Sequence, residues 1–318
     1  MVSAEFESIL EKYNKAKIKT YKVLELLGTD YTFNDYGADV INKHYQQLLN
    51  CGTVLTFAKE EVNGKKIYHL THSNFCRQRI CPMCQFRKSE KTFAEMLKVV
   101  EHLDEKGYRF LHLVLTIPNA RGGRELIEGI KKLYKGFSRF LRKKQIERAF
   151  KGCLRCLEIS YNYDNDTFHP HLHCLIAVNK SYFNDSKTYL SYDKIKQLWA
   201  DSCGLDTTQG IFYQVFVRAM KQGDRVGVAE VCKYCVKPLD LESNDSFERE
   251  TQNINVLLTL SHTLKGTRFL QKYGCVKDTY NELFRNNNDD DLCEELNSEG
   301  MKKHTLFWNT NTMRYGVG

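Results

Sequence analysis

The chain has 318 residues and a formal net charge of +8, with 47 Lys and Arg against 39 Asp and Glu. Hydrophobic residues make up 42% and charged residues 27%, which excludes a disordered or fibrous chain. The sequence contains no run of about 18 apolar residues, which a membrane-spanning helix would need. The N-terminus lacks the hydrophobic stretch of a signal peptide. We therefore expect a cytoplasmic protein with no membrane partner. In that reducing compartment its 12 cysteines are candidates for metal binding and not for disulfides.

The pattern along the chain predicts an α+β protein in four parts. Residues 1–50 have the amphipathic spacing of helices, with Gly28 as a stop signal. Residues 51–100 form a cysteine-rich, zinc-binding region whose Asn63-Gly64 pair predicts a β-hairpin. Residues 101–275 alternate helical and strand patterns, and we expect an antiparallel sheet flanked by helices. Residues 276–318 contain an acidic tract and are expected to form a mobile tail.

The strands and helices of residues 101–275 can be placed approximately. The strands are expected at 109–117, 154–163, 171–178 and 211–218. A long basic helix or helix pair is expected at 124–151, and shorter helices at 192–203 and 227–236.

Three cysteines, Cys76, Cys81 and Cys84, lie close enough in sequence to bind one zinc ion, which needs a fourth ligand. Cys51 and His72 compete for that position. A two-residue turn at Asn63-Gly64 sets Cys51 opposite Cys76 and His72 opposite Leu55, which favours Cys51. The site looks closed, so we expect it to stabilise folding. The other eight cysteines are expected to be structural.

Basic residues follow the cysteine cluster closely. Arg77, Arg79, Arg87 and Lys88 form either a solvated basic surface or contacts to DNA phosphates.

His171 and His173 are two residues apart on a predicted strand, so both side chains point to one face and can bind one ion. A hairpin turn near Asp164-Asn165 or Asn165-Asp166 places Glu158 opposite one of them, on the same face. Two imidazoles and a carboxylate predict a site for Mn or a similar divalent ion. His169 is expected just before this strand, and His112 is expected to be a core histidine.

Glu230, Tyr234 and Lys237 are spaced to share one side of a short helix that ends at Pro238. A tyrosine can act as a covalent nucleophile on a phosphodiester, and a lysine can hold a phosphate. This spacing is common on exposed helices. It indicates a catalytic role only because the same chain also has the predicted metal-binding histidines on a strand.

These motifs together resemble those of the HUH endonucleases. The order is LVLTIPN (113–119), HPHLH (169–173) and EVCKYCVK (230–237). Within that superfamily the chain looks most like the rolling-circle replication initiators of small bacterial plasmids. The motifs of that closer match are CG (51–52), FCRQRICPMCQFRK (75–88), LEISYN (157–162), AEVCKYCVK (229–237) and TLKGTRFLQKYG (263–274). His112 stands where an apolar residue is expected.

The resemblance implies a DNA-nicking mechanism. His171 and His173 would hold Mn or Mg, and Tyr234 would attack DNA to leave a 5′-phosphotyrosine link and a free 3′-OH. Glu230 would activate the water that ends the round, and Lys237 would steady the phosphate. The expected partners are single-stranded or hairpin origin DNA and a host helicase. The oligomeric state stays open, a dimer included.

Two other functions compete with this interpretation. One is a transposase of the same superfamily, although the chain has one clear tyrosine in place of the two of related transposases. The other is a non-catalytic, zinc-dependent DNA-binding protein whose histidines are structural.

Overall fold

The structure is a computed structural model of the chain, and it describes residues 3–28, 38–205, 214–232, 247–285, 291–294, 298 and 300–317. The chain divides into two compact units. The first comprises Met1–Lys88, Pro238–Ser261 and Asn286–Gly318, and the second comprises Ser89–Lys237 and His262–Arg285. Each unit contains an antiparallel sheet and helices, which confirms the α+β prediction. No helix in these described ranges is long and apolar enough to cross a membrane.

The first unit is built on a four-stranded sheet with the order β2-β1-β8-β9. Its strands are β1 (Val54–Val62), β2 (Lys65–Ser73), β8 (Lys302–Asn309) and β9 (Arg314–Gly316). Its helices are α1 (Ala4–Gly28), α2 (Ala38–Asn50) and most of α8 (Phe247–Thr263). The apolar side of α1 places Phe6 and Tyr13 edge-on to the ring of Phe57, at 5.2 and 5.5 Å between ring centroids.

The β1–β2 hairpin forms at the predicted turn. Asn63 and Gly64 have φ angles of 52° and 75°, the positive values that a two-residue hairpin turn requires. The predicted register holds from Val62 to Phe57 and then shifts by one residue, so His72 faces Thr56 and not Leu55. The described pairing ends at Leu55 and Ser73, so the prediction that Cys51 lies directly opposite Cys76 in the ladder is wrong.

The described part of residues 276–318 is not the tail that the sequence suggested. The helix α9 (Gly274–Leu283) belongs to the second unit. Farther along, β8 pairs with β1 in the first unit, and the Tyr315 amide donates to Asn14 Oδ1 at 2.9 Å. Segments distant in sequence therefore complete each unit, and the units cut across the boundaries expected at residues 50, 100 and 275.

The second unit is built on a five-stranded antiparallel sheet with the order β6-β3-β5-β4-β7. The strands are β3 (Tyr108–Thr116), β4 (Phe150–Asn162), β5 (Thr167–Asn179), β6 (Val215–Ala219) and β7 (Leu270–Tyr273). The predicted basic helix pair is α4 (Gly122–Leu141) and α5 (Lys144–Ala149), and α6 (Tyr192–Cys203) has the predicted bounds.

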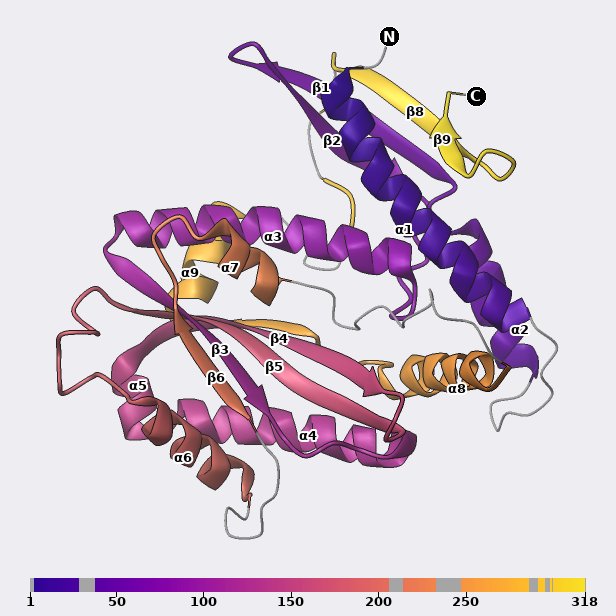
Figure 1. Cartoon of the computed structure of the whole chain (residues 1–318). Coiled ribbons are helices and arrows are strands. Elements are labelled where there is room, and N and C mark those ends of the chain that lie inside the picture. The colour runs from indigo at the N-terminus through magenta and orange to yellow at the C-terminus, as the bar shows by residue number, and fades with distance from the viewer. Residues whose placement is uncertain are drawn as a thin grey trace. The chain divides into compact units, whose positions relative to one another are not determined.

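Helices cover both faces of this sheet, as Figure 1 shows. On one face lie α7 (Arg225–Val231), α9 and the part of α3 (Pro82–Glu105) beyond Lys88. Their apolar residues pack with one side of the sheet, including Leu154, Cys156, Leu175 and Ala177. The other face carries α4 and α6. These two helices approach closely because Gly136 has no side chain, and a Cβ there would lie 2.3 Å from Cys203 Sγ.

Candidate metal centres

The two central strands bring Glu158, His171 and His173 together. Glu158 on β4 pairs with His171 on β5, one of the two registers that the turn predicted. Alternation then puts His173 on the same face, which is the face covered by α3 and α7. The Glu158 carboxylate lies 2.8 Å from His173 Nε2 and 3.6 Å from His171 Nε2. These three residues form one of the two clusters among the described residues that could hold a metal ion.

The hydrogen bond of His171 fixes which of its nitrogens faces this cluster. Its Nδ1 lies 3.0 Å from the carbonyl oxygen of His169, and a carbonyl can only accept, so Nδ1 carries the proton. The metal-binding form of the ring has its lone pair on Nε2, beside Glu158, whereas the protonated ring donates from Nε2 to that carboxylate. The first of these is the arrangement that metal-binding histidines use.

His173 has a corresponding hydrogen bond, with His112 as its partner. His112 Nε2 lies 3.0 Å from His173 Nδ1, and both rings are buried. If His173 Nε2 is to bind a cation with its lone pair, Nδ1 must carry the proton and donate it to His112. The prediction of a core histidine is correct for burial, but it missed this contact with a candidate ligand.

His169 lies inside β5, which begins at Thr167, and not before the strand as expected. Its Nδ1 donates to Asn119 Oδ1 at 2.6 Å, and its ring centroid lies 5.0 Å from that of His171. Burial, followed by the nearby His171, lowers the pKa of His169 to about 4. His169 is therefore neutral near pH 7 and borders the cluster.

The charge of the cluster suits a divalent cation. Burial opposes the ionisation of Glu158, but hydrogen bonds with His171 and His173 outweigh it and hold the pKa of Glu158 below its ordinary value. The donor set is one carboxylate and two imidazole nitrogens. Carboxylate and imidazole donors bind divalent ions, and three protein ligands would leave coordination positions for other ligands.

The predicted catalytic helix is described in part. α7 ends at Val231 and packs against the face of the sheet that carries the cluster. Glu230 is half-buried on this helix. Tyr234 and Lys237 lie outside the described residues.

The second cluster lies in the first unit and consists of Cys51, Cys76, Cys81 and Cys84, the four predicted cysteines. The sulfur of Cys51 lies 3.4 Å from that of Cys84 and 3.5 Å from that of Cys81, and the Cys76 and Cys84 sulfurs are 3.7 Å apart. A disulfide would need about 2.05 Å. Four sulfurs about 2.3 Å from a tetrahedral zinc ion are roughly 3.8 Å apart, so the spacing fits zinc.

Backbone amides also point at these sulfurs. The Cys76 amide donates to Cys51 Sγ at 3.3 Å, and the Arg77 amide donates to Cys84 Sγ at 3.2 Å. Burial raises the pKa of Cys81, but hydrogen bonds from the other three thiols outweigh it and lower that pKa well below the ordinary value. A lowered pKa favours the thiolate, which is the form that binds metal.

Lys17 supplies a buried positive charge beside the cysteines. Its Nζ donates to the carbonyl oxygens of Cys51 at 2.6 Å and Leu49 at 3.2 Å. Burial lowers the pKa of Lys17, whereas the four cysteines raise it. Sequence reasoning missed this residue, because one lysine on an amphipathic helix carries no signal of its own.

Comparison with known proteins decides the family. A family model described as a replication protein matches residues 67–316. The chain belongs to this replication protein family. A protein called "Protein rep" from Bacillus sp is 30% identical over 78% of this chain and 83% of its own length. One from Streptococcus pneumoniae serotype 2 (strain D39 / NCTC 7466) is 27% identical over 97% of this chain and 95% of its own length.

A third relative of the same name, from Lactiplantibacillus plantarum, is 28% identical over 86% of this chain and 84% of its own. No solved structure matches the chain. The relatives confirm the resemblance to plasmid replication initiators, and the two clusters lie in the matched region except for Cys51.

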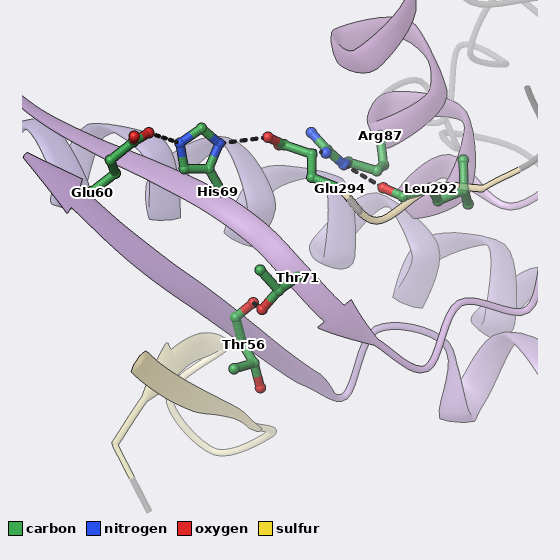
Figure 2. Close-up of polar contacts among 7 residues, drawn as sticks. All are labelled: Thr56, Glu60, His69, Thr71, Arg87, Leu292 and Glu294. Carbon is green, nitrogen blue, oxygen red and sulfur yellow. Dashed lines mark hydrogen bonds and ion pairs between the residues drawn. The ribbon is translucent and has the colours of Figure 1, made fainter. Parts of the chain in front are cut away.

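The basic residues after the cysteine cluster differ in their availability to DNA. In this replication protein, Arg87 is buried, donates from Nε to the Leu292 carbonyl at 2.7 Å and lies 3.0 Å from the Glu294 carboxylate (Figure 2). It holds the segment around Leu292 in place, so the prediction that it contacts DNA is wrong. The Arg77 side chain is exposed, whereas Arg79 and Lys88 are partly buried.

Seven of the eight cysteines expected to be structural are described, and none belongs to the four-cysteine cluster. Five are buried, and Cys275 and Cys293 are half-buried. Cys235 lies outside the described residues.

Proposed function

We propose that this replication protein starts rolling-circle replication of a plasmid by nicking one DNA strand at the origin. The observation that carries the proposal is the cluster of Glu158, His171 and His173 on one face of the central strands. It occurs in a chain whose family replicates DNA and whose sequence places a tyrosine four residues after Glu230.

In this proposal Nε2 of His171 and of His173, with the Glu158 carboxylate, would hold Mn²⁺ or Mg²⁺. A bound divalent ion would draw electron density from a phosphate oxygen and make the phosphorus a better electrophile. The Tyr234 phenol loses its proton as its oxygen attacks that phosphorus, the bond to the 3′ oxygen breaks, and the 3′ oxygen takes up a proton. The products are a 5′-phosphotyrosine link and a free 3′-OH that primes synthesis.

Glu230 and Lys237 have supporting roles in the cleavage cycle. The Glu230 carboxylate takes a proton from the water that later hydrolyses the phosphotyrosine bond and ends the round. The Lys237 ammonium steadies the phosphate. The four-cysteine cluster would hold Zn²⁺ and stabilise the first unit. The sequence has no G-x4-GK[ST] phosphate loop, so a host helicase would separate the strands.

Incubation with a single-stranded origin oligonucleotide and Mn²⁺ tests the proposal. The wild type should form a covalent protein–DNA adduct, Tyr234→Phe should form none, and Glu230→Ala should cut but accumulate the adduct. The absence of a wild-type adduct, or an undiminished adduct with Tyr234→Phe, would contradict the nicking mechanism. Loss of the first cut in Glu230→Ala would give Glu230 another role.

A further inference from the structure

The segment 122–151, which comprises α4, α5, the link between them and the first residues of β4, carries a large excess of positive charge. Between Gly122 and Lys151 there are ten basic and three acidic residues, a net charge of +7 in 30 residues against +8 for the whole protein. The proposed function assigns nothing to this segment. It also lies on the face of the sheet opposite to the Glu158–His171–His173 cluster, because α4 packs on the Arg155 side of β4.

Four of the five basic residues of α4 line one hollow of about 280 Å³. It is lined by Glu128, Lys131, Lys132, Lys135, Arg139 and Cys203. Lys131, Lys135 and Arg139 are spaced by four residues and share one side of the helix. The amino groups of Lys131, Lys132 and Lys135 form no ion pair with any described residue, whereas Arg124 lies 3.9 Å from Glu128. These three amino groups are therefore available to bind an anion from solution.

The shape and composition of this surface indicate which anion it fits. α4 has 20 residues and is about 30 Å long, so it can follow several phosphates of a DNA backbone. Binding of single-stranded DNA depends on exposed aromatic rings on which bases stack. α4 has none, because Phe137 and Phe140 are buried and the Tyr134 ring is covered by the Arg155 guanidinium, 3.8 Å from the ring centroid.

We propose that this α4 surface, formed by Lys131, Lys132, Lys135 and Arg139, binds the phosphate backbone of double-stranded DNA without reading its sequence. The inference rests on the proposed function for the choice of DNA as the polyanion. The surface would hold duplex next to the origin while the opposite face of the sheet engages the strand to be cut.

The test measures the affinity for a duplex of random sequence as a function of salt. Fluorescence anisotropy with a duplex of roughly 20 base pairs, at about 50 to 200 mM salt, gives the slope of log affinity against log salt concentration. The variant replaces Lys131, Lys132 and Lys135 by Gln. Its slope should be smaller by roughly 2 to 3, since each phosphate contact contributes about 0.9.

Two control variants separate this surface from general charge and from misfolding. Lys12, Lys15 and Lys19 are exposed on α1, and replacing them by Gln changes the net charge equally. This variant should keep the wild-type slope, as should Lys131→Arg, Lys132→Arg and Lys135→Arg combined. Equal slopes for the two Gln variants would overturn the proposal, as would a larger effect of the α4 variant on a single strand than on the duplex. The assay has no cleavage step, so failure of the nicking mechanism would not alter its outcome.

Discussion

At the scale of single residues, His112 lies where its hydrogen bond with His173 can set which nitrogen of His173 binds a metal ion. In the form of His173 that would bind a cation through its Nε2 lone pair, Nδ1–H donates a hydrogen bond to His112 Nε2, 3.0 Å away. Contacts of this kind orient metal ligands and raise their basicity. His112 is therefore a positioning residue, and its effect should appear in metal affinity.

Substitution of His112 tests this role. His112→Leu removes the acceptor and leaves the buried Nδ1–H of His173 without its partner, so affinity for Mn²⁺ should fall about 10- to 100-fold. His112→Gln keeps an oxygen acceptor and should recover much of that affinity. Titration of Mn²⁺ followed by electron paramagnetic resonance measures both variants in the absence of DNA. Equal affinity of His112→Leu and wild type would rule the role out.

The cysteine cluster gives a second residue-scale prediction. Wild type should contain about one zinc per chain, and Cys81→Ser should lose it, since three thiolates hold zinc less well than four. Cys174→Ser is the matched control, because Cys174 is buried but lies outside the cluster. Elemental analysis of purified protein measures the zinc. A well-folded wild type without zinc would contradict the assignment.

At the scale of elements, β2 and the segment 291–294 are joined through His69. Its Nδ1 lies 2.6 Å from the Glu294 carboxylate and its Nε2 lies 2.9 Å from that of Glu60 (Figure 2). Burial lowers the pKa of His69, but hydrogen bonds with the two glutamates outweigh it, and the net effect is a raised pKa. The imidazolium form therefore stabilises this link.

This link makes the stability of the first unit dependent on pH. The folded-state pKa is raised, so the stabilisation is complete below about pH 6.5, the ordinary histidine pKa, and is lost as pH rises through the folded-state value. The melting temperature of wild type should therefore exceed that of His69→Gln at pH 6, and the difference should shrink by about pH 9. A difference that is constant over this range would show that the His69 charge does not contribute.

Local turn chemistry explains which elements the sequence could predict. The predicted turn near Asp164-Asn165 or Asn165-Asp166 allowed two registers for β4 and β5, and the structure has the one that sets Glu158 opposite His171. The β1–β2 register was right only up to Phe57, because no local signal marks the irregularity between Thr56 and Phe57. β8 was missed altogether, because it pairs with a strand some 250 residues earlier and only Leu306 of its apolar residues is buried.

The candidate sites, like the elements, were predictable where nearby residues form them and not where distant residues do. Both histidines and three of the four cysteines were predicted because their spacing within a turn or strand brings them together, whereas Cys51 was predicted from a hairpin register that does not extend to it. The role of His112 needed the pairing of β3 with β5, and the ion pair of Arg87 needed the distant Glu294. Neither contact has a signature in the neighbouring sequence.

At the scale of the whole molecule, the described residues of each compact unit contain one candidate metal cluster. The four cysteines belong to the first unit and fit a closed, structural site. The Glu158–His171–His173 cluster belongs to the second unit, and a divalent ion held by these three ligands would keep positions for a substrate. On this account removal of zinc should affect folding, whereas removal of the divalent ion should affect cleavage alone.

The central claim is that this replication protein cuts DNA through a tyrosine, and the most direct measurement is the mass of the attached peptide. After reaction with a single-stranded origin oligonucleotide and Mn²⁺, the protein is digested with trypsin and the DNA-bound peptide is analysed by mass spectrometry. The account predicts one adduct, in which the peptide containing Tyr234 carries the 5′-phosphorylated fragment. An adduct on another residue, or cleavage with no covalent intermediate, would contradict it.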